Sequence, residues 1–471
     1  MKKQNKENQS KRPVKDTTNK WKCKARKRQK TIKRLTQRVR ELELSRDKWR
    51  SKALSKGSSP VLSAVKASGH QYPLQMILLV LYFQVYGRMS LRSCRHCIGR
   101  MFFVLGLSCR VPSHSSIRNW ICKQGYFRLR EAEERTGSYV VYVDESISFG
   151  SEKILLILGT REDKLPSQRA IRHGDVEVLY VGIGREWKSE DIASALGQVG
   201  GNKHVSYVIS DQGTNIGKAC KSSQHVQIYD CTHRFANYLK DIHDKTPQFE
   251  AFCKLIGTLR KSWNLSKKYS DHMPPAMRHK MRFANIFPCV DWALRCLASW
   301  ENFDEKQREC LLWLKDNDAF VKALKHQGDI FKAVCKTLKT KGFSEAQKTE
   351  LVQHLKTWDA EYAQEEGSVR LIKHVLQYLD ELSEKIKVLD RQMILCSSDI
   401  IESVFGRFKQ KISPNSRNGL TEFIFTIANF SENFCMDEIK KALESVKLDD
   451  LAQLKNGIEL PNKKTKKQDE K

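Results

Sequence analysis

The run Tyr139-Val140-Val141-Tyr142-Val143-Asp144 is a short, β-branched and aromatic segment that ends in a single carboxylate. Such a run predicts a β-strand buried on both faces. Further apolar runs at 154–158, 176–183, 205–209 and 226–229 predict four more strands. A helix expected at 189–198 would cross from the third strand to the fourth, which predicts an α/β sheet. Burying an unpaired carboxylate in a strand is energetically unfavourable, so we expect Asp144 to have an interaction partner or a functional role.

Two other acidic residues occupy comparable places. Asp211 follows the run 205–210, and Glu402 lies in the segment 397–409, which has a helical pattern. Two strand-borne aspartates and one helix-borne glutamate are what a magnesium site requires, because Mg²⁺ prefers carboxylate oxygens, water and phosphate. Glu145 is expected on the opposite sheet face. Asp399, one helical turn before Glu402, is the alternative third ligand.

Charge favours a polyanionic partner. The 471 residues include 84 Lys and Arg against 54 Asp and Glu, a formal charge of +30, and the first 56 residues hold 22 of those basic residues against 5 acidic ones. Nucleic acid is the expected partner, with a membrane surface as the other common one. No signal peptide is expected, and the longest apolar stretch, 73–86, predicts a buried helix rather than a membrane span. The fourteen scattered cysteines are typical of reduced thiols in a cytosolic or nuclear protein.

The first two predicted parts of the chain are a basic arm and a helical domain. Residues 1–57 are expected to be disordered at first and then helical, with Ile32, Leu35, Val39 and Leu42 at coiled-coil spacing, and to end in a hinge at 57–60. These four residues would form the interface of a coiled-coil dimer. The alternative is a single helix whose apolar residues face solvent. Residues 58–135 predict a helix-turn-helix domain whose second and third helices are capped by Ser90 and Ser113. A generic three-helix bundle has a similar pattern. The candidate DNA-contacting residues of the third helix are Ser115, Ser116, Arg118, Asn119 and Lys123.

The remaining boundaries follow changes in periodicity. Residues 136–244 carry the strands, 245–392 have helical patterns without strand signals, and 393–455 return to the segment of Glu402. Residues 456–471 are expected to be a disordered basic tail.

Four segments resemble the DDE transposases of bacterial insertion sequences, which have a ribonuclease-H-like catalytic domain. They are Tyr142-Val143-Asp144-Glu145-Ser146, Ile209-Ser210-Asp211-Gln212-Gly213-Thr214-Asn215, Asp230-Cys231-Thr232-His233, and the segment from Asp399 to Lys409. The resemblance covers roughly residues 70–430. It implies a ribonuclease-H-like mixed sheet with an all-helical insertion, preceded by the helix-turn-helix domain and the basic arm.

The resemblance also implies a function. Asp144, Asp211 and Glu402 would be catalytic ligands of two Mg²⁺ (or Mn²⁺) ions in a DNA transposase that cleaves and joins strands at terminal inverted repeats. Expected partners are double-stranded DNA and further copies of the chain, as a homodimer or higher oligomer, with no membrane. The expected location is the bacterial cytoplasm at the nucleoid, or the nucleus in a eukaryote. The alternatives are a ribonuclease-H-like nuclease or resolvase and a non-catalytic DNA-binding regulator.

Other residues have open roles. Asp230 and His233 either bind a second metal or brace the core, and Arg407 and Lys409 are candidates for contact with DNA phosphates. The Tyr and Arg that accompany such a lysine in some insertion-sequence families are replaced here by Leu395 and Ser398, which leaves the sub-family open. The pair Cys94 and Cys97 resembles half a zinc site, although core packing is the simpler interpretation. Related enzymes stack an aromatic residue of the insertion on an unpaired base, a role open to Trp292 or Trp300.

Overall fold

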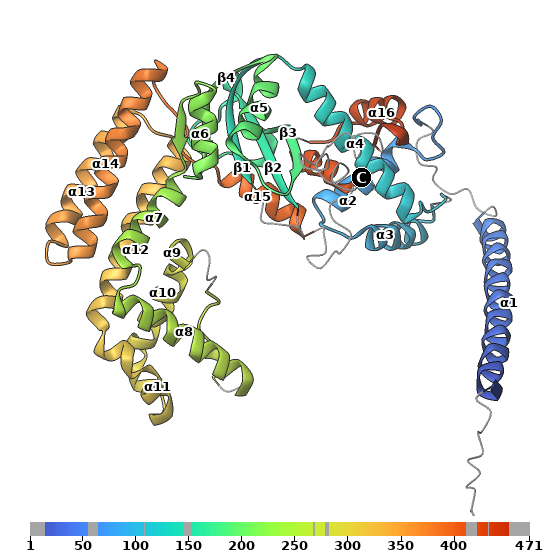
Figure 1. Cartoon of the computed structure of the whole chain (residues 1–471), viewed down its shortest axis with the longest axis horizontal. Helices are drawn as coiled ribbons and strands as arrows, with labels where there is room; N and C mark the ends of the chain where they lie inside the picture. Colours follow the sequence, from blue (N-terminus) through green and yellow to red (C-terminus); the bar gives the residue numbers. More distant parts are fainter. Residues whose placement is uncertain are drawn as a thin grey trace, which may run out of the picture. The chain divides into compact units, whose positions relative to one another are not determined.

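The structure is a computed structural model that describes residues 15–54, 65–107, 109–145, 152–266, 269–277, 282–410, 422–431 and 433–451. The chain forms two compact units, one of residues 1–64 with 96–111 and one of residues 65–95 with 112–471. The first unit contains α1 (Lys15–Leu54) and most of α3 (Leu91–Val104). The elements discussed below belong to the second unit unless stated otherwise (Figure 1).

Some predicted features lie outside the described residues. They are the start of the basic arm, the hinge at 57–60, Ser146 and the tail beyond residue 451. Within the described part of the chain, no helix combines the length and hydrophobicity needed to cross a membrane. The described cysteines are all free thiols.

A five-stranded mixed sheet forms the centre of the second unit. Its order is β3-β2-β1-β4-β5, with β1–β2 and β2–β3 antiparallel and β1–β4 and β4–β5 parallel. The strands are β1 (Gly137–Glu145), β2 (Lys153–Arg161), β3 (Glu177–Gly184), β4 (Lys203–Ser210) and β5 (Gln227–Tyr229). All five coincide with predicted apolar runs, which confirms the α/β class. Val140 to Val143 are buried in succession because helices cover both faces of the sheet.

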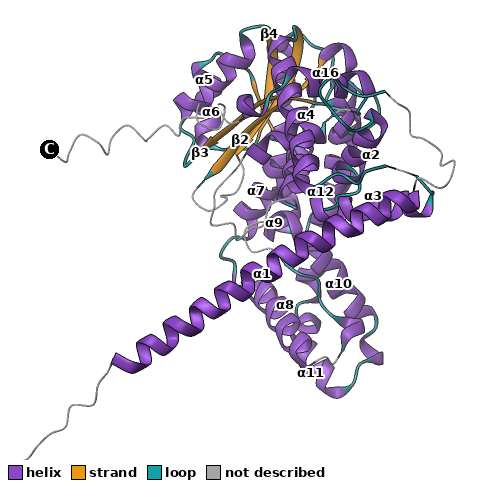
Figure 2. Ribbon diagram, turned by 90° about the vertical axis from the view of Figure 1, so that its right-hand side faces the viewer, coloured by secondary structure: helices purple, strands orange, loops and turns teal. Residues whose placement is uncertain are grey.

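One face of the sheet packs against α5 (Ser189–Gly200) and α6 (Thr214–Ser222). Val141 and Val143 of β1 join Ile192 and Leu196 of α5 in one apolar cluster. The opposite face carries Tyr142 and Asp144, since side chains alternate along a strand. On that face α15 (Asp399–Lys409) contacts β1. Figure 2 shows the strands enclosed between helices on either side.

The segment 245–392 is helical, as predicted. Its helices are α8 (Pro247–Ser266), α9 (Arg282–Asn285), α10 (Phe287–Ala298), α11 (Glu305–Asp316), α12 (Asp318–Lys341), α13 (Glu345–Glu361) and α14 (Glu366–Leu389). Single 3₁₀ turns lie at Ser270–His272 and Trp300–Asn302. Two contacts tie this region to the sheet: the hydroxyl of Tyr378 donates to the carbonyl of Tyr229, and α14 packs on α7 (Cys231–His243).

The remaining helices gather around α4 (His114–Glu134). They are α2 (Leu74–Val85), the 3₁₀ segment η6 (Glu422–Phe430) and α16 (Met436–Ser445). Two shorter 3₁₀ turns, Glu162–Lys164 and His173–Asp175, lie in the chain between β2 and β3. α4 contacts α2, η6, α16 and β3. Its first turn is capped as predicted, with the Ser113 hydroxyl accepting from the Ser116 amide.

The compact units divide the predicted helix-turn-helix domain. α2 and α4 belong with the sheet, whereas α3 from His96 onward belongs to the other unit. The boundary between the two units therefore falls inside α3, between Arg95 and His96. The 21-residue α4 also buries side chains from Ile117 to Ala132 against its neighbours, so only its beginning has the exposure expected of a DNA-reading helix.

Candidate active site

Three aspartates stand at one end of the three parallel strands. The register pairs Val143 with Ser210 and Ser210 with Tyr229. The next residue along each strand is Asp144, Asp211 and Asp230, respectively. Because the carboxyl ends of parallel strands meet at one sheet edge, the alternation that places Tyr142 beside Ile209 also places Asp144 beside Asp211.

Glu402 comes to this edge from α15. That helix buries Ile400, Ile401, Val404, Phe405 and Phe408, and it contacts β1. Glu402 lies off this apolar stripe, with its side chain 48% exposed. The amphipathic pattern thus fixes the helix on the sheet while it leaves the Glu402 carboxylate accessible.

The electrostatics of Asp144 show that the three carboxylates lie close together. Burial, followed by the charges of Asp211 and Glu402, raises the pKa of Asp144 to about 8. His233 and a backbone hydrogen bond from Glu145 oppose the shift. Strand register thus sets Asp144 beside Asp211, and Glu402 lies near enough for its charge to act on Asp144.

Glu402 and Asp230 flank His233, the third residue of α7. Nε2 of His233 lies 3.0 Å from Oε1 of Glu402. Its Nδ1 lies 3.3 Å from Oδ1 of Asp230, an ion-pair distance without a well-directed hydrogen bond. The carboxylates of Asp230 and Glu402 raise the pKa of His233 to about 11, although burial favours the neutral ring. The imidazolium is thus the cation nearest to Glu402 in this site.

Asp230 has a structural position. Its side chain is 1% exposed, Oδ1 accepts from the His233 amide at 2.8 Å, and Oδ2 accepts from the Ser398 amide at 2.7 Å. Burial raises its pKa, but His233 and these amides outweigh burial, so the pKa lies below the usual aspartate range. One carboxylate therefore caps the first turn of α7 and the entry to α15. This arrangement favours the bracing role over a second metal site.

Asp399 has different neighbours from those of Glu402. Its carboxylate pairs with Lys339 of α12 at 2.5 Å and accepts a 3.3 Å hydrogen bond from Thr232. Asp144 responds to the charge of Glu402, and Asp399 is not among the principal charges that act on it. This geometry favours Glu402 as the third carboxylate of the site. Glu145, which we expected on the other face, pairs with Lys153 at 3.0 Å.

The candidate DNA-contacting residues of α4 fall into two groups. Ser115 is exposed in the first turn, while the Ser116 amide is bound to the Ser113 hydroxyl. Arg118 and Asn119 are partly buried one turn later. Lys123 donates to the carbonyl of Leu443 in the last turn of α16, and burial lowers its pKa. Lys123 therefore interacts with the C-terminal end of α16, where a cation is favourable, and does not extend from an open surface.

Arg407 and Lys409 lie on different sides of α15. The Nζ of Lys409 is 5.7 Å from the centre of the Phe405 ring, and the side chain is partly exposed. The Arg407 guanidinium is partly buried, with Nη1 enclosed and without an acceptor. Burial, followed by the charge of Arg88, lowers the pKa of Arg407.

The remaining candidates have simpler environments. Trp292 is 3% exposed and donates to the carbonyl of His272, so it is a core residue as placed here. Trp300 is partly exposed, with Lys315 lying 5.5 Å from its ring centre. Cys94 is fully buried, and its thiol faces the carbonyl of Met89 at 4.0 Å. Core packing accounts for Trp292 and Cys94.

The donor set of the carboxylate site fits a hard divalent cation. Asp144 and Asp211 supply oxygens at adjacent strand ends, and Glu402 supplies oxygens from α15. Burial and then the charges of Asp211 and Glu402 raise the pKa of Asp144, and a bound cation would favour its ionised form. In this structure no three His, Cys, Asp or Glu side chains of the described residues are already arranged around a common metal position. In this arrangement Oε1 of Glu402 is paired with His233.

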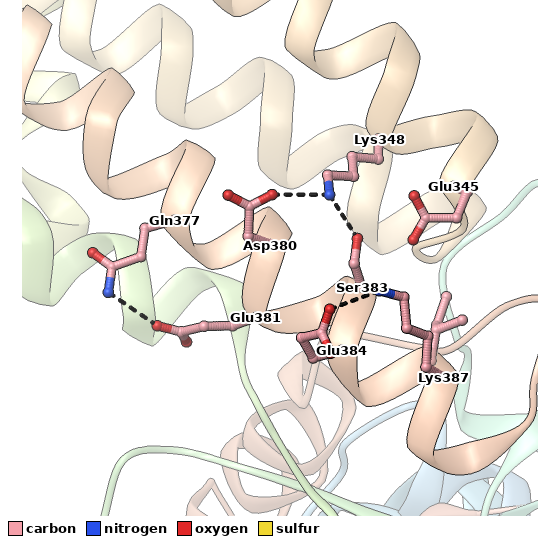
Figure 3. Close-up of a pocket in the computed structure, with 9 residues that line it drawn as sticks. Glu345, Lys348, Gln377, Asp380, Glu381, Ser383, Glu384 and Lys387 are labelled. Atoms are coloured by element: carbon pink, nitrogen blue, oxygen red, sulfur yellow. Dashed lines mark hydrogen bonds and ion pairs between the residues drawn. The ribbon is translucent and has the colours of Figure 1, made fainter.

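A separate pocket of about 520 Å³ lies between α13 and α14, away from the three carboxylates. Figure 3 shows that its charged side chains largely satisfy one another: Lys348 binds Asp380 and Ser383, and Lys387 binds Glu384. This pocket contains none of the residues that the sequence singled out.

Two features were missed by sequence reasoning. The pairing of His233 with Glu402 has no signal in either segment alone, since it depends on how α7 and α15 are juxtaposed. The contact between His173 and Ser403, 2.9 Å from Nε2 to Oγ, likewise joins distant segments. The Asp230-Cys231-Thr232-His233 segment drew attention to His233 but gave no indication of its pairing with Glu402, and no sequence signal pointed to His173.

Comparison of the sequence with known protein families finds no family model that matches, and no curated protein matches it significantly. The functional conclusion therefore depends on the residues and geometry described above.

Proposed function

We propose that the protein is a DNA transposase of the DDE type, which cleaves and joins DNA strands with the help of divalent metal ions. The single observation that carries the proposal is the convergence of Asp144, Asp211 and Glu402, from two strands and a helix, into one electrostatically coupled group. The excess of basic residues, +30 overall, supports a nucleic-acid partner.

The fold supports the same assignment. An antiparallel β3-β2-β1 meander continued by parallel β4 and β5, with the acidic residues at the ends of β1 and β4, is consistent with a ribonuclease-H-like domain. The helical segment 245–392 precedes the helix of Glu402, as in the family that the sequence resembles. Fold alone does not fix function, so the argument depends on the site.

Asp144, Asp211 and Glu402 would hold Mg²⁺ or Mn²⁺, two ions per site. When bound, such ions activate an attacking oxygen and stabilise the leaving one in an in-line displacement at phosphorus. His233 orients Glu402 through its 3.0 Å contact, and Asp230 positions both helices that carry this pair. The first reaction would be hydrolysis of a phosphodiester at each element end, and the second would be attack of the freed 3′-hydroxyl on target DNA.

A cleavage assay on DNA that carries the inverted repeats flanking the coding region tests the proposal. We expect nicking that requires Mg²⁺ or Mn²⁺, followed by joining to a target duplex, and loss of both steps in Asp144→Asn. Cleavage without joining would favour a nuclease or resolvase. Specific binding to the repeats without any cleavage by the unmodified protein would favour a regulator.

A further inference from the structure

The C-terminal end of α2 presents two exposed aromatic rings. Tyr82 and Tyr86 stack with their centres 5.3 Å apart, and they are 36% and 44% exposed. Both rings pack edge-on against Phe434, at 5.8 and 6.3 Å. Large aromatic side chains are usually buried, so an exposed pair held in a fixed stack offers a surface for another flat ring.

A buried arginine and an exposed hydrogen bond hold this aromatic pair in place. The guanidinium of Arg128 lies 4.6 Å from the centre of the Phe434 ring and is paired with Glu438 at 2.6 Å. The hydroxyl of Tyr86 donates to the side chain of Asn433 at 3.0 Å. The rings are therefore preorganised, which lowers the entropy lost when a partner binds.

Three basic side chains lie near one another at this end of α2. Arg88 comes two residues after Tyr86, and its charge acts on both Arg407 and His173. Arg407 in turn acts on Tyr86 and His173. Among the described residues, no carboxylate pairs with any of these three, and Nη1 of Arg407 is enclosed without an acceptor. Burial and the two arginines lower the pKa of His173, so its ring is neutral, and the like charges are the guanidinium groups of Arg88 and Arg407. Two such groups without a carboxylate partner in the described part of the chain indicate a site for an anion.

This basic cluster adjoins the three carboxylates along α15. His173 contacts Ser403, which follows Glu402, and Arg407 lies one turn beyond Ser403. Five residues of helix from Glu402 to Arg407 advance about 7.5 Å. Because one strand of DNA carries a phosphate about every 3.4 Å along the duplex axis, the cluster lies within a few nucleotides of a phosphate at the carboxylates.

We propose that Tyr82, Tyr86, Arg88, His173 and Arg407 bind an unpaired DNA strand next to the phosphodiester that is cut. The guanidinium groups take phosphate oxygens, and the exposed ring of Tyr82 stacks on a base. An unpaired strand is the fitting ligand, because the bases of a duplex stack on each other and offer no free face to a tyrosine. This inference rests on the proposed function and names the substrate form that the site holds.

Fluorescence anisotropy of labelled 12-nucleotide strands tests the inference without catalysis. The full chain carrying Asp144→Asn is measured in EDTA, against a normal strand and a strand of the same length without bases. We expect Tyr82→Ala to weaken binding of the normal strand by about 5- to 150-fold and to leave binding of the abasic strand unchanged. The parent protein itself should prefer the normal strand, a comparison that needs no further variant.

The phosphate contacts are tested with Arg88→Asn, since asparagine tolerates the positive φ of 52° at this position. We expect weaker binding of both strands and a shallower dependence of affinity on salt, by about 0.7 in the logarithmic slope for one lost phosphate contact. Arg295→Gln, an exposed arginine of α10, is the control with the same loss of charge.

Two results would overturn the inference: an equal effect of Tyr82→Ala on both strands, or an effect of Arg88→Asn no larger than that of Arg295→Gln. Its failure can be told apart from failure of the proposed function. If the unmodified protein cleaves DNA while these variants bind like the parent, only the strand site is wrong. If Tyr82→Ala weakens binding of the normal strand alone and the unmodified protein does not cleave DNA, the proposed reaction is wrong and the proposed binding site is supported.

Discussion

His233 Nε2 lies 3.0 Å from Oε1 of Glu402 and joins α7 to α15 at the mouth of the carboxylate site. The contact places a cation, whose pKa is raised to about 11 by Asp230 and Glu402, against one oxygen of a proposed metal ligand. The charge of Glu402 also acts on Asp144. His233 thus acts as an orienting partner of a ligand, a role that is widespread around protein metal sites.

Replacement of His233 should impair metal use. We expect His233→Ala to lower the cleavage rate or the apparent Mn²⁺ affinity by about 10- to 100-fold, because Glu402 loses its fixed orientation. His233→Gln, whose amide can still donate to Glu402, should lose less. The measurement is cleavage rate against Mn²⁺ concentration, with the exposed His354→Ala of α13 as control. A His233→Ala protein with an unchanged metal titration would contradict this role.

Glu402 and Asp399 lie on the same helix, so substitutions of the two carboxylates can be compared directly. Glu402→Gln should reduce cleavage on the order of 10³-fold, the scale expected for loss of one preorganised charge at a reacting phosphate. Asp399→Asn should cost less than about tenfold, because Asp399 pairs with Lys339 and Thr232 away from the site. Thermal melting of both variants checks that the fold is retained. The reverse order of effects would make Asp399 the third ligand.

The raised pKa of Asp144 predicts a pH-dependent stability. The folded-state pKa of about 8 lies above the unfolded value of about 3.9, so the folded state binds the proton more tightly. Metal-free stability should therefore fall as pH rises from about 4 to about 8, and Asp144→Asn should remove this component of the fall. Thermal melting in EDTA across this range provides the measurement, with Asp163→Asn, an exposed residue, as control.

The same pKa predicts proton release when Mg²⁺ binds. At pH 7 Asp144 is about nine-tenths protonated, so binding should release about 0.9 proton from this residue, and almost none at pH 9. Calorimetry in buffers with different ionisation enthalpies measures this number. Release that is equal at both pH values, or that persists in Asp144→Asn, would contradict the assignment of the proton to Asp144.

Asp230 should affect stability more than chemistry. Its buried carboxylate accepts from the amides of His233 and Ser398. Asp230→Asn keeps the shape but replaces one acceptor with a donor, so we expect a loss of about 2–4 kcal/mol in unfolding free energy. Denaturant unfolding measures the change, and Asp163→Asn, at an exposed ion pair, should cost less than about 1 kcal/mol. Equal effects of the two substitutions would contradict the capping role.

The strands and the identity of the three carboxylates could be predicted from local pattern. β-branched runs between turn residues specify buried strands, and an acidic residue at the end of such a run is conspicuous because burial of an unpaired charge is unfavourable. These residues can converge only because β1 pairs in parallel with β4. The resemblance to a known family implied this pairing, whereas the apolar sequence runs did not indicate it. α6, directly after Asp211, was missed because its apolar residues are few and its start lacks a side-chain cap.

The burial of α4 could not be predicted. Ser113 marks its start, but its neighbours come from the other end of the chain. A Cβ placed on Gly125 would lie 1.9 Å from the carbonyl oxygen of Phe425, so the helix and η6 touch backbone to backbone there. A glycine within a helical pattern ordinarily indicates only a weaker helix. Glycine is needed at position 125 because η6 approaches α4 closely there, and this approach depends on packing between residues far apart in the sequence.

The exposed apolar stripe of α1 predicts self-association. Ile32, Leu35, Val39 and Leu42 repeat at coiled-coil spacing, and each is more than half exposed. A 40-residue helix gains stability chiefly by burying such a stripe against a partner. In a parallel pair, Arg38 of one copy would face Glu43 of the other across the seam, whereas an antiparallel pair centred on the stripe would bring the two Arg38 side chains together. A parallel dimer is therefore the expected form.

The double variant Leu35→Lys with Leu42→Lys should abolish this association, because it puts four ammonium groups into the seam of a dimer. Gln37→Lys with Leu44→Lys adds the same charge outside the stripe and should leave association intact. Light scattering of the full chain after gel filtration measures the mass against the 54.5 kDa monomer. If the unmodified chain is monomeric at micromolar concentration, or if both double variants remain dimeric, α1 is not the dimer interface. The two active sites that the proposed function requires would then have to be brought together by another surface or by the DNA itself.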